Sequence, residues 1–279
     1  MRIVSLLPAA TEILYALGLA TEVVGVSAGC DHPSDALAVP RATTAAGLDR
    51  AALVGLEPDL VLVGDGSTGS GAREVREALA VLGADVSVVT LAPTSVEGVF
   101  NAISTVGAMT EAEDAAMDVV ERLRERLRAV EQIVIGRRDH GFRPPRVAAL
   151  DGLVPPRAVG WWVPDQVRLA GGWELLGAAG GAPSPSSWDA IREVDPEVLV
   201  LMPRELDLEA GLAAWARVSP PAGWADLRAV SERCVFLVDG ACHSRPGPRI
   251  VDGIETLAEL IDPLAFDGMA PPASWARVG

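Results

Sequence analysis

The stretch RIVSLLPAATEILYALGLATEVVGVS, residues 2–27, contains two short apolar runs separated by a segment that opens with proline. Residues 2–7 and 22–27 are rich in Val, Ile and Leu, and this composition favours β-strands. The segment between them begins at Pro8 and ends at Gly18, which is the pattern of a short helix. A strand, a helix and a second strand in this order are typical of a βαβ unit with parallel strands. We therefore expect an α/β fold.

The alternation of strands and helices continues along the chain, and the two halves repeat one another. Segments 57–63 (EPDLVLV) and 195–201 (DPEVLVL) share an acid, a proline, a second acid and an apolar run. Each half also opens with a strand that begins at an arginine and is followed by a Pro-led helix. These repeats predict two Rossmann-like α/β lobes. Further strands are expected at 59–64, 85–91, 146–152, 197–203 and 234–240.

The longest helical pattern lies between the two halves. Apolar residues recur at spacings of three and four from Ala116 to Val130, and Thr110 with Glu113 forms a potential capping box. We expect one helix from Thr110 to Gln132 that joins the lobes; an ordinary surface helix is the alternative. The expected organisation is an N-terminal α/β lobe, a bridging helix with its linker, and a C-terminal α/β lobe, at residues 1–108, 109–145 and 146–279.

Charge and hydropathy exclude several classes of partner. The formal net charge is −15, with 38 acidic and 23 basic residues, all of the latter arginine. This balance disfavours nucleic acids and anionic membranes as partners. The apolar runs are strand-sized, so no membrane insertion is expected. No leader is visible at the N-terminus, which predicts a cytoplasmic location, or export if the sequence is a mature form whose leader is removed. We expect a monomer that binds a small molecule.

Two adjacent tryptophans, Trp161 and Trp162, occur in VGWWVPDQVRLAGG, residues 159–172, of a chain with few aromatic residues. Successive side chains of a strand point in opposite directions, so a strand cannot bury both on one face. We expect Trp162 to pack beneath the helix that starts near Pro164 and Trp161 to project toward the crevice where α/β proteins bind ligands. An indole stacks well on a flat apolar ligand. The alternative is that both rings belong to the core or to the interface between the lobes.

Cysteine and histidine occur in two loops that follow strands of opposite halves. The sequences are GCDHP, with Cys30 and His32, and GACHSRPG, with Cys242 and His243. Thiolate and imidazole suit zinc, copper or haem iron, so Cys30, His32 and His243 are candidate ligands of a metal or of a bound cobalt. A small buried cysteine and a turn-forming Asp-His-Pro are the alternative interpretation, because the spacing is not diagnostic.

The loop GDGSTGSG, residues 64–71, is glycine-rich and follows a strand, but it lacks the lysine of a phosphate-binding loop. Its hydroxyl and amide groups are able to bond a polar ligand edge from a helix N-terminus. Asp65 and Ser67 are therefore candidate ligand contacts, together with Pro8 at the start of the first helix; a flexible connecting loop is the alternative. The chain has no GxSxG motif, and no pair of acids stands out as an acid/base couple.

Five segments in sequence order resemble the helical-backbone metal-receptor family, which is class III periplasmic-binding-protein-like, and in particular its cobalamin-binding members. The resemblance implies two α/β lobes bridged by one long helix, a ligand held between them, and delivery to the membrane subunits of an ABC importer. The implied ligands are cobalamin or a related corrinoid, with haem or a ferric siderophore as alternatives. The segments are residues 2–33, 56–63, 162–172, 186–203 and 245–260.

Some residues of this chain match those of the cobalamin binders, and others do not. Trp188 and Arg245 match a cleft tryptophan and an arginine of the cobalamin binders, and Trp162 matches a tryptophan of a WVPE-like motif. Where those binders have aromatic residues in the first lobe, this chain has Gly64 and Thr90. Ala241 replaces an acid that precedes the arginine, and Trp161 stands at a position that is frequently histidine. We therefore expect cobalamin to bind weakly, or a different ligand to be preferred.

Two functional hypotheses follow from the sequence. The first is a solute-binding protein for a corrinoid or another bulky metal chelate, with Trp161, Trp162, Trp188 and Arg245 as ligand contacts. The second is an enzyme on the same two-lobed frame, metal-dependent or cofactor-free, that uses the altered cleft residues. Binding without turnover separates the two.

Overall fold

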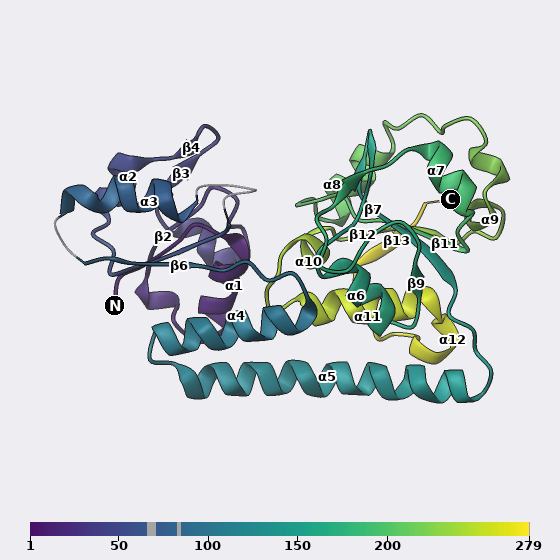
Figure 1. The fold of residues 1–279 in the computed structure, drawn as a ribbon, viewed down its shortest axis with the longest axis horizontal. Helices are drawn as coiled ribbons and strands as arrows, with labels where there is room; N and C mark the ends of the chain where they lie inside the picture. The colour runs from purple at the N-terminus through teal and green to yellow at the C-terminus, as the bar shows by residue number, and fades with distance from the viewer. Residues whose placement is uncertain (66–70, 83–84, 279) are drawn as a thin grey trace. The chain divides into compact units, whose positions relative to one another are not determined.

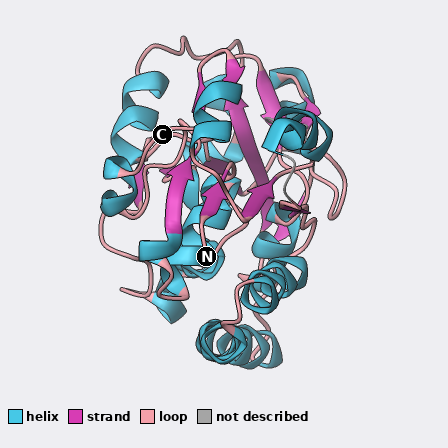
Figure 2. Cartoon of the chain, turned by 90° about the vertical axis from the view of Figure 1, so that its left-hand side faces the viewer, coloured by secondary structure: helices cyan, strands magenta, loops and turns pink. Residues whose placement is uncertain are grey.

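The computed structural model describes residues 1–65, 71–82 and 85–278, and these divide into two compact units (Figure 1). Each unit has its own β-sheet, and Figure 2 shows helices in cyan beside strands in magenta. The predicted α/β class is confirmed. Unit 1 comprises Met1–Pro93 and Gly98–Arg122, and unit 2 comprises Thr94–Glu97 and Leu123–Gly279.

The sheet of unit 1 has four parallel strands in the order β2-β1-β5-β6. Strands β1 and β5 are buried along their whole length, which explains why their sequences are continuous apolar runs rather than alternating ones. The strands are β1 (Ile3–Ser5), β2 (Val23–Val26), β5 (Leu60–Val63) and β6 (Ser87–Thr90), with a separate hairpin of β3 (Thr43–Thr44) and β4 (Gly47–Leu48). The helices are α1 (Pro8–Ala16), η1 (Ala20–Glu22), η2 (Ser34–Ala38), α2 (Arg50–Gly55), α3 (Ala72–Leu79) and η3 (Ala80–Leu82).

The predicted connecting helix, Thr110 to Gln132, is α5 (Glu113–Asp139), and a further helix, α4 (Val96–Met109), precedes it. The predicted capping box at Thr110 is wrong. The Thr110 hydroxyl donates instead to the backbone carbonyl of Val106, 2.8 Å away, and so belongs to the end of α4. Glu111 has a left-handed φ of 55° and turns the chain into α5. Helix α5 begins in unit 1 and ends in unit 2, as expected of a helix that joins two lobes.

The sheet of unit 2 combines the three predicted parallel strands with short strands that the sequence did not reveal. Its order is β10-β8-β7-β11-β12-β13, with β9 beside β7. Strands β8, β10 and β13 are antiparallel to their neighbours. The strands are β7 (Arg146–Leu153), β8 (Pro156–Ala158), β9 (Trp173–Glu174), β10 (Ser184–Pro185), β11 (Val198–Leu201), β12 (Val235–Val238) and β13 (Trp275–Arg277).

The helices of unit 2 are α6 (Val163–Leu169), α7 (Trp188–Val194), α8 (Leu208–Trp215), η4 (Trp224–Asp226), α9 (Arg228–Ser231), α10 (Ala241–Ser244), α11 (Ile250–Ile261) and α12 (Pro263–Phe266). Of these, α7, α8, η4 and α9 pack against a core built from buried residues of β7, β11 and β12. Within the described ranges no helix is both long and apolar enough to cross a membrane.

Ion pairs within unit 2 bind the C-terminal half of α5 to α11 and to Asp262, the residue that follows α11. Arg126 Nε donates to Glu255 Oε1 at 2.9 Å, and its Nη2 lies 2.6 Å from Asp252 Oδ1. Nearer the C-terminal end of α5, Arg137 Nε donates to Asp262 Oδ2 at 2.6 Å. Part of the charged face of α5 therefore binds the helix to the rest of unit 2, and does not only face solvent.

The close approach of α4 and α5 yields a testable prediction. A Cβ on Gly107 would lie 2.5 Å from Ala116 Cβ and 3.1 Å from the Ala112 carbonyl oxygen, so Gly107→Ala should destabilise the protein by about 1–3 kcal/mol. Gly136 lies in α5 with nothing within 4 Å of its missing Cβ, so Gly136→Ala should stabilise by up to about 1 kcal/mol. Chemical denaturation measures both. Equal effects of the two substitutions would contradict the tight helix contact.

Candidate functional site

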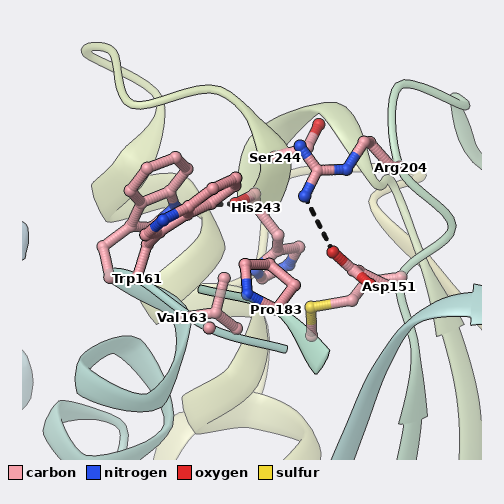
Figure 3. Close-up of a pocket in the computed structure, with 10 residues that line it drawn as sticks. Asp151, Trp161, Val163, Pro183, Arg204, His243 and Ser244 are labelled. Atoms are coloured by element: carbon pink, nitrogen blue, oxygen red, sulfur yellow. Dashed lines mark hydrogen bonds and ion pairs between the residues drawn. The ribbon is translucent and has the colours of Figure 1, made fainter. Parts of the chain in front are cut away.

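A small pocket lies at the carboxyl-terminal edge of the unit 2 sheet, where α/β proteins commonly bind ligands (Figure 3). Asp151 belongs to β7, Arg204 follows β11, and His243 follows β12, while Trp161 and Pro183 come from loops beside β8 and β10. The enclosed volume is about 10 Å³, about enough for one water molecule. The pocket is therefore too small to enclose a bulky ligand.

The two adjacent tryptophans lie in a turn that leads into α6, not in a strand. The alternation of side chains along a strand therefore does not apply to this pair. Their rings stack on each other, with centroids 5.5 Å apart and planes 20° apart, an arrangement that neighbouring residues of a strand cannot adopt. Trp162 is buried, and its Nε1 donates to the backbone carbonyl of His243 at 2.7 Å. Trp161 is half-buried and lines the pocket.

The backbone of Trp161 is held in an unfavourable conformation by the loop that ends at Pro183. Its φ of 51° is left-handed, which is rare for a bulky residue and costs about 1–3 kcal/mol. The Trp161 amide donates to the Gly181 carbonyl, and the Gly180 amide donates to the Trp161 carbonyl at 2.9 Å. Such strain persists only where its surroundings impose it, and it is typical of functional sites.

A buried carboxylate anchors the start of the same loop. Glu174 Oε1 accepts hydrogen bonds from the amides of Leu176 and Gly177, both at 3.0 Å, and Oε2 accepts one from the Ala149 amide of β7 at 3.1 Å. Burial raises the pKa of Glu174 to about 7, because removal of the charge from water outweighs the backbone donors. This carboxyl group therefore titrates near neutral pH while it ties the loop to the sheet.

The polar side of the pocket is a cluster that the sequence analysis did not predict. Asp151 Oδ1 accepts from Arg157 Nε at 2.6 Å, and Oδ2 accepts from Arg204 Nη2 at 2.9 Å. The guanidinium carbon of Arg204 also lies 5.1 Å from the centroid of a Trp161 ring, within the range of a cation–π contact. Figure 3 shows Asp151 and Arg204 on one side of the pocket and Trp161 on the other.

His243 lies at the base of the site and has a defined hydrogen-bond partner. Gln166 Nε2 donates to the Ile250 carbonyl at 2.9 Å, so the amide oxygen of Gln166 faces His243 Nδ1 at 3.1 Å. Nδ1 therefore carries the proton and Nε2 keeps its lone pair. Burial lowers the pKa of His243 to about 4, so the ring is neutral at pH 7.

Arg245 is buried, with 4% of its surface exposed, and has a carboxylate partner from another loop. Its Nε donates to Glu205 Oε2 at 2.8 Å. The sequence comparison with cobalamin binders pointed to a missing acid at Ala241; in the folded chain Glu205 pairs with this arginine instead. Arg245 is not among the residues that line the pocket.

Trp188 stands apart from the pocket, at the first residue of α7. Its ring meets that of Trp224 edge to face, with centroids 5.6 Å apart, and it packs against the hydrophobic core of unit 2. It is half-buried. These contacts favour a packing role, and a contact between Trp188 and a ligand stays a prediction.

The candidate residues of unit 1 gather where its parallel strands end. Pro8 begins α1 after β1, Cys30 follows β2, and Asp65 follows β5. Cys30 is fully buried, with its Sγ 3.0 Å from Thr11 Oγ1 and 3.1 Å from Ser27 Oγ. Ser67 lies outside the described residues.

The candidate metal ligands fall in different units. Cys30 and the exposed His32 belong to unit 1, and His243 belongs to unit 2. Within either set of described residues, no three His, Cys, Asp or Glu side chains are grouped to hold a metal ion. A metal held by Cys30, His32 and His243 stays a prediction.

Comparison with known proteins identifies the family. The periplasmic binding protein family matches residues 3–241. An uncharacterized ABC transporter substrate-binding lipoprotein of Bacillus subtilis is 26% identical over 95% of this chain and 81% of its own length. A vitamin B12-binding protein of Vibrio campbellii is 24% identical over 92% of this chain and 88% of its own. The solved structure of a periplasmic haem-binding protein of Pseudomonas aeruginosa superimposes with a TM-score of 0.81, at 23% identity, over 100% of this chain and 99% of that one.

The chain therefore belongs to the periplasmic binding protein family, and it is of the class III type, with two α/β lobes and a long connecting helix. It is a solute-binding protein of the kind that serves ABC importers, so its partners are a small-molecule ligand and the permease of such an importer. The expectation of a cytoplasmic location is wrong. The related proteins are periplasmic or are lipoproteins, which points to an exported protein.

The buried carboxylate gives a prediction of pH dependence. The folded state holds the proton of Glu174 more tightly than the unfolded state, whose pKa is about 4.5. The free energy of unfolding should therefore fall by about 3 kcal/mol through this group as the pH rises from about 4.5 to about 7. Glu174→Gln cannot ionise and should lack this component when the two proteins are denatured at about pH 5 and about pH 7.5. An unchanged pH dependence in the variant would exclude Glu174 as its source.

Proposed function

We propose that this protein binds a bulky metal chelate, such as a corrinoid, a haem or a ferric siderophore, and delivers it to an ABC importer. The family supplies the role of solute carrier, and relatives of known ligand bind vitamin B12 or haem. The observation that carries the proposal is Trp161. A strained, half-buried indole at the carboxyl edge of a sheet offers a flat apolar surface to a macrocycle.

The surroundings of Trp161 define how such a ligand would meet the site. Its indole already contacts the Trp162 ring on the protein side and the guanidinium of Arg204. A ligand that covers the exposed part of Trp161 therefore meets an aromatic surface and a cation together. Stacking on one indole buries about 150–250 Å² of ring surface, which supplies the non-polar part of the affinity. The neighbouring polar groups would fix the orientation of the ligand.

Cobalamin is expected to be a weak ligand. Gly64 and Thr90 lie where resembling cobalamin binders have aromatic residues. The acid missing at Ala241 is replaced by Glu205, which pairs with Arg245. Each missing stacking contact is worth roughly 1–2 kcal/mol, so the two together weaken binding by about a hundredfold. A chelate that depends less on those contacts should be preferred.

The proposal is tested by titration of the purified protein with haemin, cobalamin and a ferric hydroxamate, followed by visible absorption and calorimetry. We expect one ligand per chain, no turnover, and a dissociation constant for cobalamin above about 100 nM. Failure of all three chelates to bind would contradict the proposed function. Nanomolar binding of cobalamin would show that other residues replace the missing contacts.

Two matched tryptophan variants separate binding from packing. Trp161→Ala should weaken binding of the preferred chelate by about tenfold or more, and it should cost less stability than removal of a core ring because the Trp161 side chain is only half-buried. Trp188→Ala should instead lower the free energy of unfolding by about 2–4 kcal/mol, because it removes a ring packed on Trp224 and the core. Affinity and denaturation are measured for both variants. If Trp188→Ala loses affinity and keeps its stability, Trp188 contacts the ligand.

A further inference from the structure

Arg204 is fixed in place by contacts on two sides. Its Nη2 donates to Asp151 Oδ2 at 2.9 Å, and its guanidinium carbon lies 5.1 Å from the centroid of a Trp161 ring. The backbone amide of Arg204 also donates to the carbonyl of Asp151, so main chain and side chain are joined to the same residue of β7. An arginine held in this way presents its remaining donors in a fixed geometry, and no ordering of the side chain is needed when a ligand binds.

The donors of Arg204 are incompletely used. Among the residues that the structure describes, Nη2 is the only guanidinium nitrogen of Arg204 with an acceptor, and Nε is buried without one. Ser244, which also lines the pocket, accepts from the Glu205 amide through Oγ at 3.2 Å, so its hydroxyl proton remains available to a ligand. A buried N–H donor without an acceptor is unfavourable, and such groups are uncommon unless something else satisfies them.

The charge at this position opposes that of the whole chain. Arg157 and Arg204 share the single carboxylate of Asp151, so this cluster carries a surplus positive charge. The chain as a whole carries a formal net charge of −15. Arg245 does not add to the surplus, because it pairs with Glu205. The pocket therefore places a local positive charge beside an aromatic surface, on a protein whose net charge is negative.

We infer that Arg204 determines ligand specificity and selects a chelate that carries carboxylates at the edge of its flat ring. The inference rests on the proposed function and narrows its ligand class to metal porphyrin carboxylates. A carboxylate accepts two parallel hydrogen bonds from a guanidinium, which the neutral amides of a corrin edge cannot match. The ring of the same ligand covers the exposed part of Trp161, and its carboxylate lies against the unused donors of Arg204 and Ser244.

The test compares haemin with haemin dimethyl ester, which keeps the flat chelate and removes both carboxylate charges. We expect the wild-type protein to bind haemin about tenfold or more tightly than the ester. Arg204→Met keeps the apolar stem but removes the donors, and it should lower haemin affinity by about that factor while it leaves ester affinity nearly unchanged. Arg204→Lys keeps the charge and should restore part of the preference for haemin.

Arg168→Met is the matched control, because Arg168 is an exposed arginine of α6 in the same unit, paired with Asp165, and the substitution makes the same change in charge. It should leave the affinities for both porphyrins unchanged. Equal binding of haemin and its ester to the wild-type protein, or an equal loss of both in Arg204→Met, would overturn the inference. Binding of cobalamin or the hydroxamate without either porphyrin would overturn it and leave the proposed function standing; binding of no chelate would overturn both.

Discussion

The site of unit 2 depends on two backbone segments that approach so closely that no side chain fits between them. A Cβ on Gly160 would lie 2.5 Å from both the Gly181 carbonyl oxygen and the Pro183 nitrogen. A Cβ on Gly177 would lie 2.5 Å from the Val159 carbonyl oxygen. Glycine at both positions lets residues 177–183 lie directly on the segment that carries the tryptophan pair. The loop in turn imposes the left-handed conformation of Trp161.

The chemistry of the site follows from that placement. The constrained Trp161 faces the guanidinium of Arg204, which Asp151 holds from the neighbouring strand. An aromatic surface, a cation and a neutral histidine thus meet at the carboxyl edge of one sheet. These groups come from segments that follow different strands, so the parallel order β7-β11-β12 brings them together. The family role of carrying a solute and the local excess of positive charge then point to one class of ligand.

The main strands were predictable because their sequences are short, apolar and bounded by turn residues, and the parallel sheet buries both faces of each. The short antiparallel strands were not, because two or three residues carry no periodic signal. The Trp161 turn was missed because a bulky residue gives no sequence sign of a left-handed φ. Asp151 and Arg204 are more than 50 positions apart in the sequence, and Glu205 and Arg245 are 40 positions apart. Such pairs meet because of the order of the strands in the sheet, and this order cannot be deduced from a single sequence.

The affinity of the Gly160→Ala variant for haemin tests the central claim most directly. The substitution changes none of Trp161, Asp151 and Arg204, but its methyl group would clash with the backbone at Gly181 and Pro183 and force the loop away from the tryptophan turn. A folded Gly160→Ala protein, checked by its melting transition, should bind haemin about tenfold or more weakly than wild type, because Trp161 is no longer held beside Arg204. Wild-type affinity in the folded variant would contradict the claim that this close approach builds the site.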